Sequence, residues 1–291
     1  MSLLDTAVTQ EFSYRALLEE GVKRLYNDFD TPRIDAEVLL LHAVKKDMSW
    51  LIVYGDRLAE KDHIIDFYEL IEQRAVGQPI AYLTGHKEFW SLDLIVNPSV
   101  LIPRPDTETL VEQALESLSK NEENSILDLG TGSGAIALAI AKERPQDKVL
   151  ATDNSPTALN VAKQNAEKNN ITNVSFIKSD WFSQIDGQEF ELIISNPPYI
   201  EPDDAHLQQG DLRFEPETAL IGAGDGLDDI RHIISTACIF LSDGAHLIIE
   251  HGYNQQQQAT ELFTQHGYQN IKTHQDLNKL PRCTLGTWLK R

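Results

Sequence analysis

Residues 125–141 read SILDLGTGSGAIALAIA, an apolar run, a glycine-rich turn and a second apolar run in direct succession. The first run, residues 126–129, predicts a buried strand, and residues 136–141 predict the helix that follows it. Glycines between the two allow a tight turn and let a ligand approach the helix N-terminus. We therefore expect a ligand-binding strand–turn–helix unit at this place in the chain.

Four further apolar runs follow at helical separations, at residues 149–152, 174–177, 192–195 and 246–250. Strands that alternate with helices in this way predict an α/β fold with a doubly wound, mostly parallel sheet. The C-terminal stretch, with Gly267-Tyr268 and then residues 283–288, predicts two closing strands. Ligands of such sheets bind at the carboxyl ends of the strands.

The first 84 residues have the pattern of a small all-helical domain without reactive side-chain clusters. Pro32 predicts the first turn of one helix, and the apolar spacing places Ile34, Val38 and Leu41 on its buried stripe. Residues 88–102, EFWSLDLIVNPSVLI, predict a hairpin around an Asn97-Pro98 turn. We expect three parts: a helical domain over 1–84, a β-hairpin linker over 85–102 and the α/β domain over 103–291.

The charge balance restricts the partners of the protein. The chain has 45 acidic and 25 basic residues, a formal charge of −20, which repels phosphate backbones and anionic lipid. Nucleic acid and membrane are therefore disfavoured. Cys238 and Cys283 form neither a disulfide framework nor a zinc spacing, so we expect no metal site and a reducing compartment. Residues 1–20 lack an apolar signal core, which favours a cytoplasmic protein.

The glycine-rich turn alone leaves the ligand open. Gly130, Gly132 and Ala135 also satisfy the dinucleotide pattern G-x-G-x-x-A, so a nicotinamide or flavin, S-adenosylmethionine or a purely structural turn all fit. Asp153, at the end of the next strand, suits two ribose hydroxyls because its carboxylate accepts two hydrogen bonds. Asp153 also fits the start of the following helix, but Ser155 before a proline is the better cap.

Two further strand ends have polar or aromatic residues. Asp180 and Trp181 follow the third strand, where they suit the amine and ring of a purine, or equally a helix cap beside a buried aromatic. Asn196, Pro197, Pro198 and Tyr199 follow the fourth strand. Two consecutive prolines end the strand and donate no backbone hydrogen bond. The Asn196 side-chain oxygen and the Pro197 carbonyl are therefore a pair of acceptors for a planar NH2 group, on which Tyr199 can pack.

The motifs DLGTGSGAIALA, ATD, SDWF and SNPPYI together resemble class I S-adenosylmethionine methyltransferases that modify planar nitrogens. The segments EFWSLDLIVNPSVLIPRPDTETLVEQAL, GDLRFEPETAL, IIEHG and RCTLG narrow the resemblance to the HemK/PrmC family. Members of that family methylate the glutamine N5 in the Gly-Gly-Gln loop of class I peptide chain release factors. The resemblance covers the chain from about residue 15 onward and implies a class I methyltransferase fold, a seven-stranded Rossmann-like sheet behind a helical domain.

The resemblance also implies roles for individual residues. The cofactor, S-adenosylmethionine, would be held by these residues: Gly130, Thr131, Gly132, Ser133 and Gly134 at the methionine part, Asp153 at the ribose, Asp180 and Trp181 at the adenine, with Asn196 and Arg104 beside them. The substrate glutamine would be bound by Asn196, Pro197, Pro198 and Tyr199, of which Asn196, Pro197 and Tyr199 are the expected catalytic residues. The helical domain would recognise the release factor.

Several roles and alternatives stay open at this point. Glu250 and His251 have no assigned role, and Arg213 and Glu215 either order the loop beyond Tyr199 or form a surface ion pair. A DNA or RNA amino-methyltransferase acting on a flipped base would use the same acceptor pair. An NAD-dependent oxidoreductase fits the glycine turn but leaves the Asn-Pro-Pro-Tyr segment without a purpose, and a non-catalytic binding module would bind cofactor without turnover.

Overall fold

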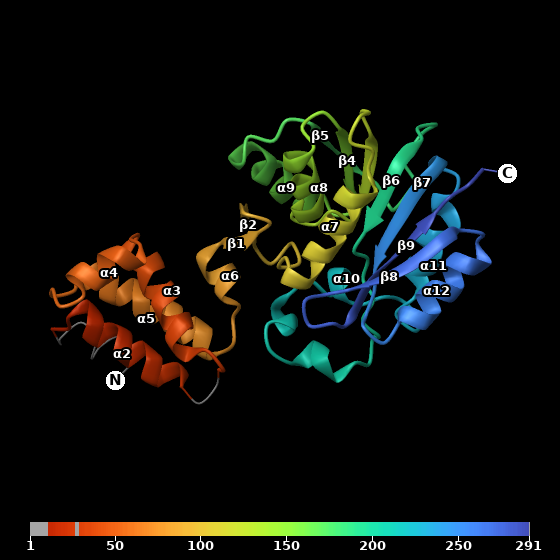
Figure 1. Ribbon diagram of the computed structural model, residues 1–291. Coiled ribbons are helices and arrows are strands. Elements are labelled where there is room, and N and C mark those ends of the chain that lie inside the picture. Colours follow the sequence, from red (N-terminus) through yellow and green to blue (C-terminus); the bar gives the residue numbers. More distant parts are fainter. Residues whose placement is uncertain (1–10, 27–28, 291) are drawn as a thin grey trace. The chain divides into compact units, whose positions relative to one another are not determined.

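The computed structural model describes residues 11–26 and 29–290, and the chain divides between Gly85 and His86 into two units, each with its own hydrophobic core (Figure 1). The first unit contains five helices within the described residues: α2 (Tyr14–Leu25), α3 (Pro32–Val44), α4 (Met48–Tyr54), α5 (Lys61–Ala75) and α6 (Ile80–Thr84). Within the described residues of both units, no helix is long and apolar enough to cross a lipid bilayer.

Helix α3 is buried on a different face from the one that the sequence predicts. Ile34 and Val38 are 60% and 37% exposed, whereas Ala36, Leu39 and Leu40 are fully buried. Four consecutive apolar residues, 38–41, give the helix more than one possible apolar stripe. Packing selects one of them, because α3 contacts both α2 and α5 and buries the face that these two helices share.

The hairpin forms, but its turn lies seven residues before the predicted Asn97-Pro98. Strands β1 (His86–Phe89) and β2 (Leu92–Ile95) pair antiparallel and are joined by Trp90 and Ser91, which have positive φ angles of 51° and 56°. Non-glycine residues rarely adopt this conformation, so the sequence gives little turn signal here. Tertiary contacts hold the turn, since the Trp90 backbone N–H donates to Glu108 Oε1 at 3.0 Å.

Seven strands form the sheet of the second unit: β3 (Ser125–Leu129), β4 (Lys148–Asp153), β5 (Val174–Lys178), β6 (Phe190–Ser195), β7 (Leu241–Glu250), β8 (Gln269–Gln275) and β9 (Pro281–Thr287). Their order is β5-β4-β3-β6-β7-β9-β8, and β9 runs antiparallel to both of its neighbours while the other pairs are parallel. The predicted mostly parallel, seven-stranded doubly wound sheet is confirmed.

Helices cover both faces of this sheet (Figure 1). One face packs against α7 (Glu108–Ser117), α8 (Ala135–Glu143) and α9 (Pro156–Lys168), and the other against α11 (Asp228–Ala237) and α12 (Gln256–Gln265). Successive residues of β3 alternate between the two cores, with Ile126 in the first and Leu127 in the second. Burial on both faces explains why the parallel strands read as continuous apolar runs.

The connections of β3 diverge at its carboxyl end, a switch point that we call the crevice. The chain leaves β3 for β4 on one side, while β6 lies on the other side with Ser195 in register with Leu129. The Ser195 hydroxyl donates to the Leu129 carbonyl at 2.8 Å and ties the two strand ends together. Strand order reverses here, and this is the position at which open α/β sheets bind ligands.

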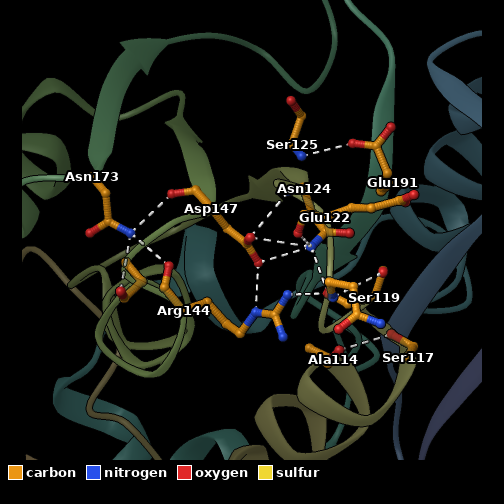
Figure 2. Close-up of polar contacts among 12 residues, drawn as sticks. Ala114, Ser117, Ser119, Glu122, Asn124, Ser125, Arg144, Asp147, Asn173 and Glu191 are labelled. Atoms are coloured by element: carbon orange, nitrogen blue, oxygen red, sulfur yellow. Dashed lines mark hydrogen bonds and ion pairs between the residues drawn. The ribbon is translucent and has the colours of Figure 1, made fainter.

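A buried polar network fixes the opposite, amino-terminal edge of the sheet (Figure 2). The Asp147 carboxylate accepts from Arg144 Nε at 2.7 Å and from the Asn124 backbone N–H at 3.1 Å. The Asn173 amide donates to the carbonyls of Ala141, Arg144 and Asp147 at 3.0–3.1 Å. These bonds join the segments that lead into β3, β4 and β5, so the edge away from the crevice is a structural one.

Candidate active site

Three glycines shape the turn after β3. Gly130, Gly132 and Gly134 have φ angles of 72°, 56° and 85°, a region that residues with a side chain avoid. A Cβ on Gly134 would lie 3.2 Å from the Ala162 Cβ, so this glycine allows α8 to pack closely on α9. A Cβ on Gly132 would meet no described atom within 4 Å, so the space above this residue is open.

Asp128 lies at the base of the turn and is fully buried. One carboxylate oxygen, Oδ2, accepts from the Thr131 hydroxyl at 2.7 Å, whereas Oδ1 has no hydrogen-bond partner among the described residues. Burial raises the pKa of Asp128 to about 7, against the opposing effect of the Thr131 bond. A buried acceptor without a partner is costly and signals a site completed by a ligand.

The raised pKa of Asp128 predicts a pH dependence of stability. Because the folded-state pKa of about 7 exceeds the ordinary value of 3.8, the folded chain binds the extra proton more tightly between these two values. The contribution of Asp128 to the free energy of unfolding is therefore largest below pH 4 and is lost as pH rises through about 7. Asp128→Asn should reduce this loss, as measured by urea unfolding of the cofactor-free protein at several pH values. An unchanged slope would contradict the burial of the charged form.

Asp153, at the end of β4, lies against the glycine turn. Its Oδ2 accepts from the Gly132 backbone N–H at 2.9 Å, and its Oδ1 accepts from the Ser155 N–H at 2.8 Å. A carboxylate oxygen can accept two hydrogen bonds, so both oxygens of Asp153 retain capacity for a ligand. Ser155, not Asp153, caps α9, because its hydroxyl accepts from the Ala158 N–H at 3.2 Å.

The Trp181 ring reaches the same turn from the end of β5. Its nearest ring carbon lies 3.5 Å from the position of a Cβ on Gly130. Trp181 has a φ of 47°, and its carbonyl accepts from the Ser179 hydroxyl at 2.7 Å, which holds this uncommon backbone conformation. Asp180 is exposed beside it. The structure therefore brings the ring of Trp181 to the edge of the crevice, next to Asp180.

The Asn196-Pro197 segment leaves the sheet with two acceptors at the carboxyl end of β6. Asn196 Nδ2 donates to the Thr107 hydroxyl oxygen at 3.4 Å, which points the amide oxygen the other way. Within residues 11–26 and 29–290, neither Asn196 Oδ1 nor the Pro197 carbonyl accepts a hydrogen bond. Because β6 neighbours β3, these acceptors lie at the same sheet edge as the glycine turn.

Tyr199 is held at both of its ends. Its hydroxyl donates to Glu250 Oε1 at 3.2 Å, and its backbone carbonyl accepts from Gln255 Nε2 at 3.0 Å. Gly226 packs against the same carbonyl, since a Cβ on this glycine would lie 2.6 Å from the oxygen. Burial raises the pKa of Glu250 to about 7 and also raises that of Tyr199.

Glu215 joins the segments on either side of the crevice. Its side chain is fully buried, forms an ion pair with Arg104, and accepts from the Ile102 backbone N–H at 2.9 Å. The surface ion pair with Arg213 considered from the sequence is wrong, because Glu215 is paired with Arg104 and buried. Arg213 instead lies over the Phe214 ring, with its guanidinium carbon 5.0 Å from the ring centre. Glu215 therefore orders the loop beyond Tyr199.

Both ring nitrogens of His251 have hydrogen-bond partners within the protein. Nδ1 lies 2.9 Å from the Gly252 carbonyl, and Nε2 lies 2.9 Å from the Thr284 hydroxyl. A carbonyl cannot donate, so Nδ1 carries the proton and Nε2 accepts. Burial lowers the pKa of His251, which keeps the ring neutral. His206, in contrast, is exposed and pairs with Asp204.

The structure adds Thr107 and Gln255, which the sequence did not single out, and it gives contacts to Glu215 and Glu250, whose roles were left open. Only Glu250 had a signal of position, since it ends the fifth apolar run of the sheet. The other three belong to loops or helix ends, and their contacts arise from residues far apart in the chain.

Comparisons with known proteins agree with this architecture. Residues 107–211 match the Methyltransferase small domain family, and residues 16–85 match the PrmC N-terminal domain family. The chain is 46% identical over 279 residues to the release factor glutamine methyltransferase of Aliivibrio fischeri, covering 95% of this chain and 98% of the relative. It is 45% identical over 275 residues to that of Escherichia coli K12, covering 94% and 99%, respectively.

Solved structures show the same fold at low sequence identity. A methyltransferase from Pyrococcus furiosus superposes with a TM-score of 0.53 at 19% identity, covering 68% of this chain and 90% of that chain. The T. thermophilus 16S rRNA N2 G1207 methyltransferase, solved with AdoMet and guanosine, gives a TM-score of 0.52 at 17% identity, covering 70% and 49%. These two structural similarities support a methyltransferase fold for this protein.

Proposed function

The chain belongs to the release factor glutamine methyltransferase family, and we propose that it methylates the glutamine N5 in the Gly-Gly-Gln motif of class I peptide chain release factors. Its membership makes it an S-adenosylmethionine-dependent methyltransferase. The observation that carries the proposed substrate chemistry is a pair of acceptors beside the glycine turn, Asn196 Oδ1 and the Pro197 carbonyl, which have no partner among the described residues. Such a pair is complementary to the two hydrogens of an amide NH2.

The residues of the crevice fit the cofactor. The unpartnered Oδ1 of Asp128 and the open space above Gly132 leave room and an acceptor for the charged amino-acid end. Asp153 has free acceptor capacity for the ribose, and Trp181 offers a ring face near Gly130 for the adenine. We assign the cofactor to these residues: Arg104, Gly130, Thr131, Gly132, Ser133, Gly134, Asp153, Asp180, Trp181 and Asn196. When bound, S-adenosylmethionine supplies a methyl group made electrophilic by its sulfonium.

The protein contributes orientation more than activation. A glutamine amide is a poor nucleophile because its lone pair is delocalised into the carbonyl. Hydrogen bonds to Asn196 and Pro197 would localise that pair as the bond to carbon forms, while Pro198 and Tyr199 confine the planar group. The proton leaves the nitrogen after transfer, so no strong base is required. His251 is not available for this step, because both of its ring nitrogens are already bonded.

Asp153→Ala should weaken S-adenosylmethionine binding about tenfold to a hundredfold, since each hydrogen bond to a charged group is worth about 1.5–3 kcal/mol. Asp153→Asn retains one acceptor oxygen and should lose less. Isothermal titration calorimetry measures both affinities. Equal affinity of the alanine variant and the wild-type protein would count against the ribose contact.

Mass spectrometry of a purified release factor, incubated with the full-length enzyme and S-adenosylmethionine, tests the function directly. We expect a gain of one methyl group on the glutamine of the Gly-Gly-Gln motif and none after Gln→Ala replacement there. Methylation of nucleic acid with no methyl on the release factor would overturn the proposal. The net charge of −20 already opposes a DNA or RNA substrate.

We further propose that the helical domain, residues 1–84, recognises the body of the release factor. In this proposal, residues 85–102 connect the helical domain to the catalytic domain over 103–291. The proposed enzyme acts in the cytoplasm, where translation takes place. The match of residues 16–85 to the PrmC N-terminal domain family supports a shared role for this unit. Removing it should raise the KM for the intact release factor far more than the KM for the cofactor.

A further inference from the structure

Four side chains from three segments form a chain of contacts behind the Asn-Pro-Pro-Tyr turn. Asn196 Nδ2 donates to Thr107 Oγ1 at 3.4 Å, and the Tyr199 hydroxyl donates to Glu250 Oε1 at 3.2 Å. Thr107 ends a 3-10 helix, η1 (Pro105–Thr107), and Glu250 ends β7. Both are buried, with 4% and 2% of their surface exposed.

The orientation of the Asn196 amide depends on its bond to Thr107. A side-chain amide has a donor end and an acceptor end, and it functions as a substrate acceptor only with its oxygen toward the substrate. The bond to Thr107 fixes the NH2 end away from the crevice. In this bond the Thr107 oxygen accepts, so its own hydroxyl proton must be donated elsewhere.

Glu250 has an acceptor oxygen for that proton. Oε2 of Glu250 is buried and has no partner within ordinary hydrogen-bond geometry among the described residues, while Thr107 is near enough to lower the pKa of Glu250 by hydrogen bonding. In its ionised form the Glu250 side chain is an acceptor only, so it can accept from both Thr107 and Tyr199 without competing with either as a donor. Thr107 then has a defined direction of donation.

Burial raises the pKa of Glu250 most, and the charges around this residue act on its pKa in both directions. Arg282 lowers the pKa of Glu250, and Asp106 raises it. Arg282 itself is shared between Asp106, at 3.1 Å, and Asp276, at 2.9 Å. Glu250 is therefore a buried acid that accepts a hydrogen bond from Tyr199, while Arg282 and Asp106 act on it through their charges.

We propose that Glu250 is the positioning residue of this active site, acting directly on Tyr199 and, through the Thr107 hydroxyl, on the direction of the Asn196 amide. The inference rests on the proposed function, in which Asn196 Oδ1 receives the substrate NH2. Removing the Thr107 hydroxyl releases the amide to rotate its NH2 end toward the substrate, where two donors then face each other. The loss is felt mainly in the transition state, because that is where the hydrogen bond to the substrate strengthens.

Substitutions at Thr107 separate positioning from packing. Thr107→Val keeps the shape and removes the hydroxyl, whereas Thr107→Ser keeps the hydroxyl and removes a methyl group. If positioning dominates, Thr107→Val lowers kcat for release-factor methylation about tenfold to a hundredfold, with KM changed less, and Thr107→Ser stays within about threefold of wild type. A packing role gives the reverse order, which would overturn the inference.

Two measurements complete the experiment on the full-length chain. Thr109→Val makes the same change at another buried threonine, two residues along, and should leave kcat near the wild-type value. Glu250→Gln replaces one acceptor by a donor and should lower kcat by a similar factor. The double variant Thr107→Val/Glu250→Gln should lose less than the product of the two single effects, since both act on Asn196 through one contact. Full multiplicativity would contradict the relay through Thr107.

S-adenosylmethionine affinity and thermal unfolding serve as controls for native structure, and both should match wild type in Thr107→Val. The outcomes also separate the two proposals. If the wild-type enzyme transfers no methyl group to the glutamine, the proposed function and this inference both fail. If wild type methylates the glutamine and Thr107→Val does so at the same rate, the function stands and the positioning role of Glu250 is wrong.

Discussion

Asn196→Ala is expected to lower kcat for methylation of the release factor by about a hundredfold to a thousandfold, the effect of removing one preorganised group that stabilises a transition state. The side chain lost is the acceptor at the carboxyl end of β6, whose oxygen has no partner in the described part of the chain. Its loss leaves the Pro197 carbonyl as the sole acceptor of the proposed pair, so the amide nitrogen is no longer aimed. Mass spectrometry with a time course of methylation gives the rate.

The control for Asn196→Ala is cofactor affinity. Asp128, Asp153 and the glycine turn are unchanged in this variant, so S-adenosylmethionine should bind within a few-fold of the wild-type affinity by calorimetry. A variant that turns over at near-normal rate would contradict the role of the amide oxygen. A variant that loses cofactor binding in proportion to its activity would show that Asn196 acts on the donor instead of the acceptor.

Asp147→Ala is expected to destabilise the second unit by about 3–5 kcal/mol, because it leaves the buried Arg144 guanidinium without its charge partner. The Asp147 side chain is fully buried, and that of Arg144 is 9% exposed. The substitution also removes acceptors of Asn124, whose backbone N–H and side-chain amide both bond to this carboxylate (Figure 2). For a unit of this size, the transition temperature should fall by roughly 10 °C in calorimetry.

A nearby surface pair provides the matched control for Asp147→Ala. Glu123 pairs with Lys148 near the same edge of the sheet, but their side chains are 56% and 75% exposed. Glu123→Gln should change the free energy of unfolding by less than about 1 kcal/mol, since exposed pairs are solvated and screened. Equal effects of the two substitutions would show that burial does not set the strength of the Arg144–Asp147 pair.

The sheet was predictable because its signal is local. Each parallel strand is buried on both faces, so its apolar residues are consecutive and stand out from the helices between them. Residues 126–129 and 192–195 were predicted as strands, and β3 and β6 contain them. The α3 stripe and the hairpin turn were wrong for the opposite reason. Ile34 and Val38 fit an apolar period that packing does not use, and the Trp90-Ser91 turn is stabilised by Glu88 within the hairpin and by Glu108 outside it.

The candidate site divides in the same way. Asp153, Trp181 and Asn196 follow strands directly, so the rule that ligands bind at carboxyl ends of strands was enough to select them. Thr107, Glu215 and Gln255 gave no such signal. Each contacts a segment that lies 56 to 113 positions away, and only the folded chain brings these partners together.

The bond from the Ser195 hydroxyl to the Leu129 carbonyl bears on how such an enzyme changes in evolution. It joins the glycine turn after β3 to the Asn-Pro-Pro-Tyr turn after β6 at the point where each turn begins. Segments farther out, such as the 3-10 helices η2 (Ala205–Gln208) and η3 (Leu212–Phe214), are outside this seam. Substitutions in these segments leave the Ser195–Leu129 bond in place, so the surface beyond Tyr199 can diverge while the two strand ends keep their relative position.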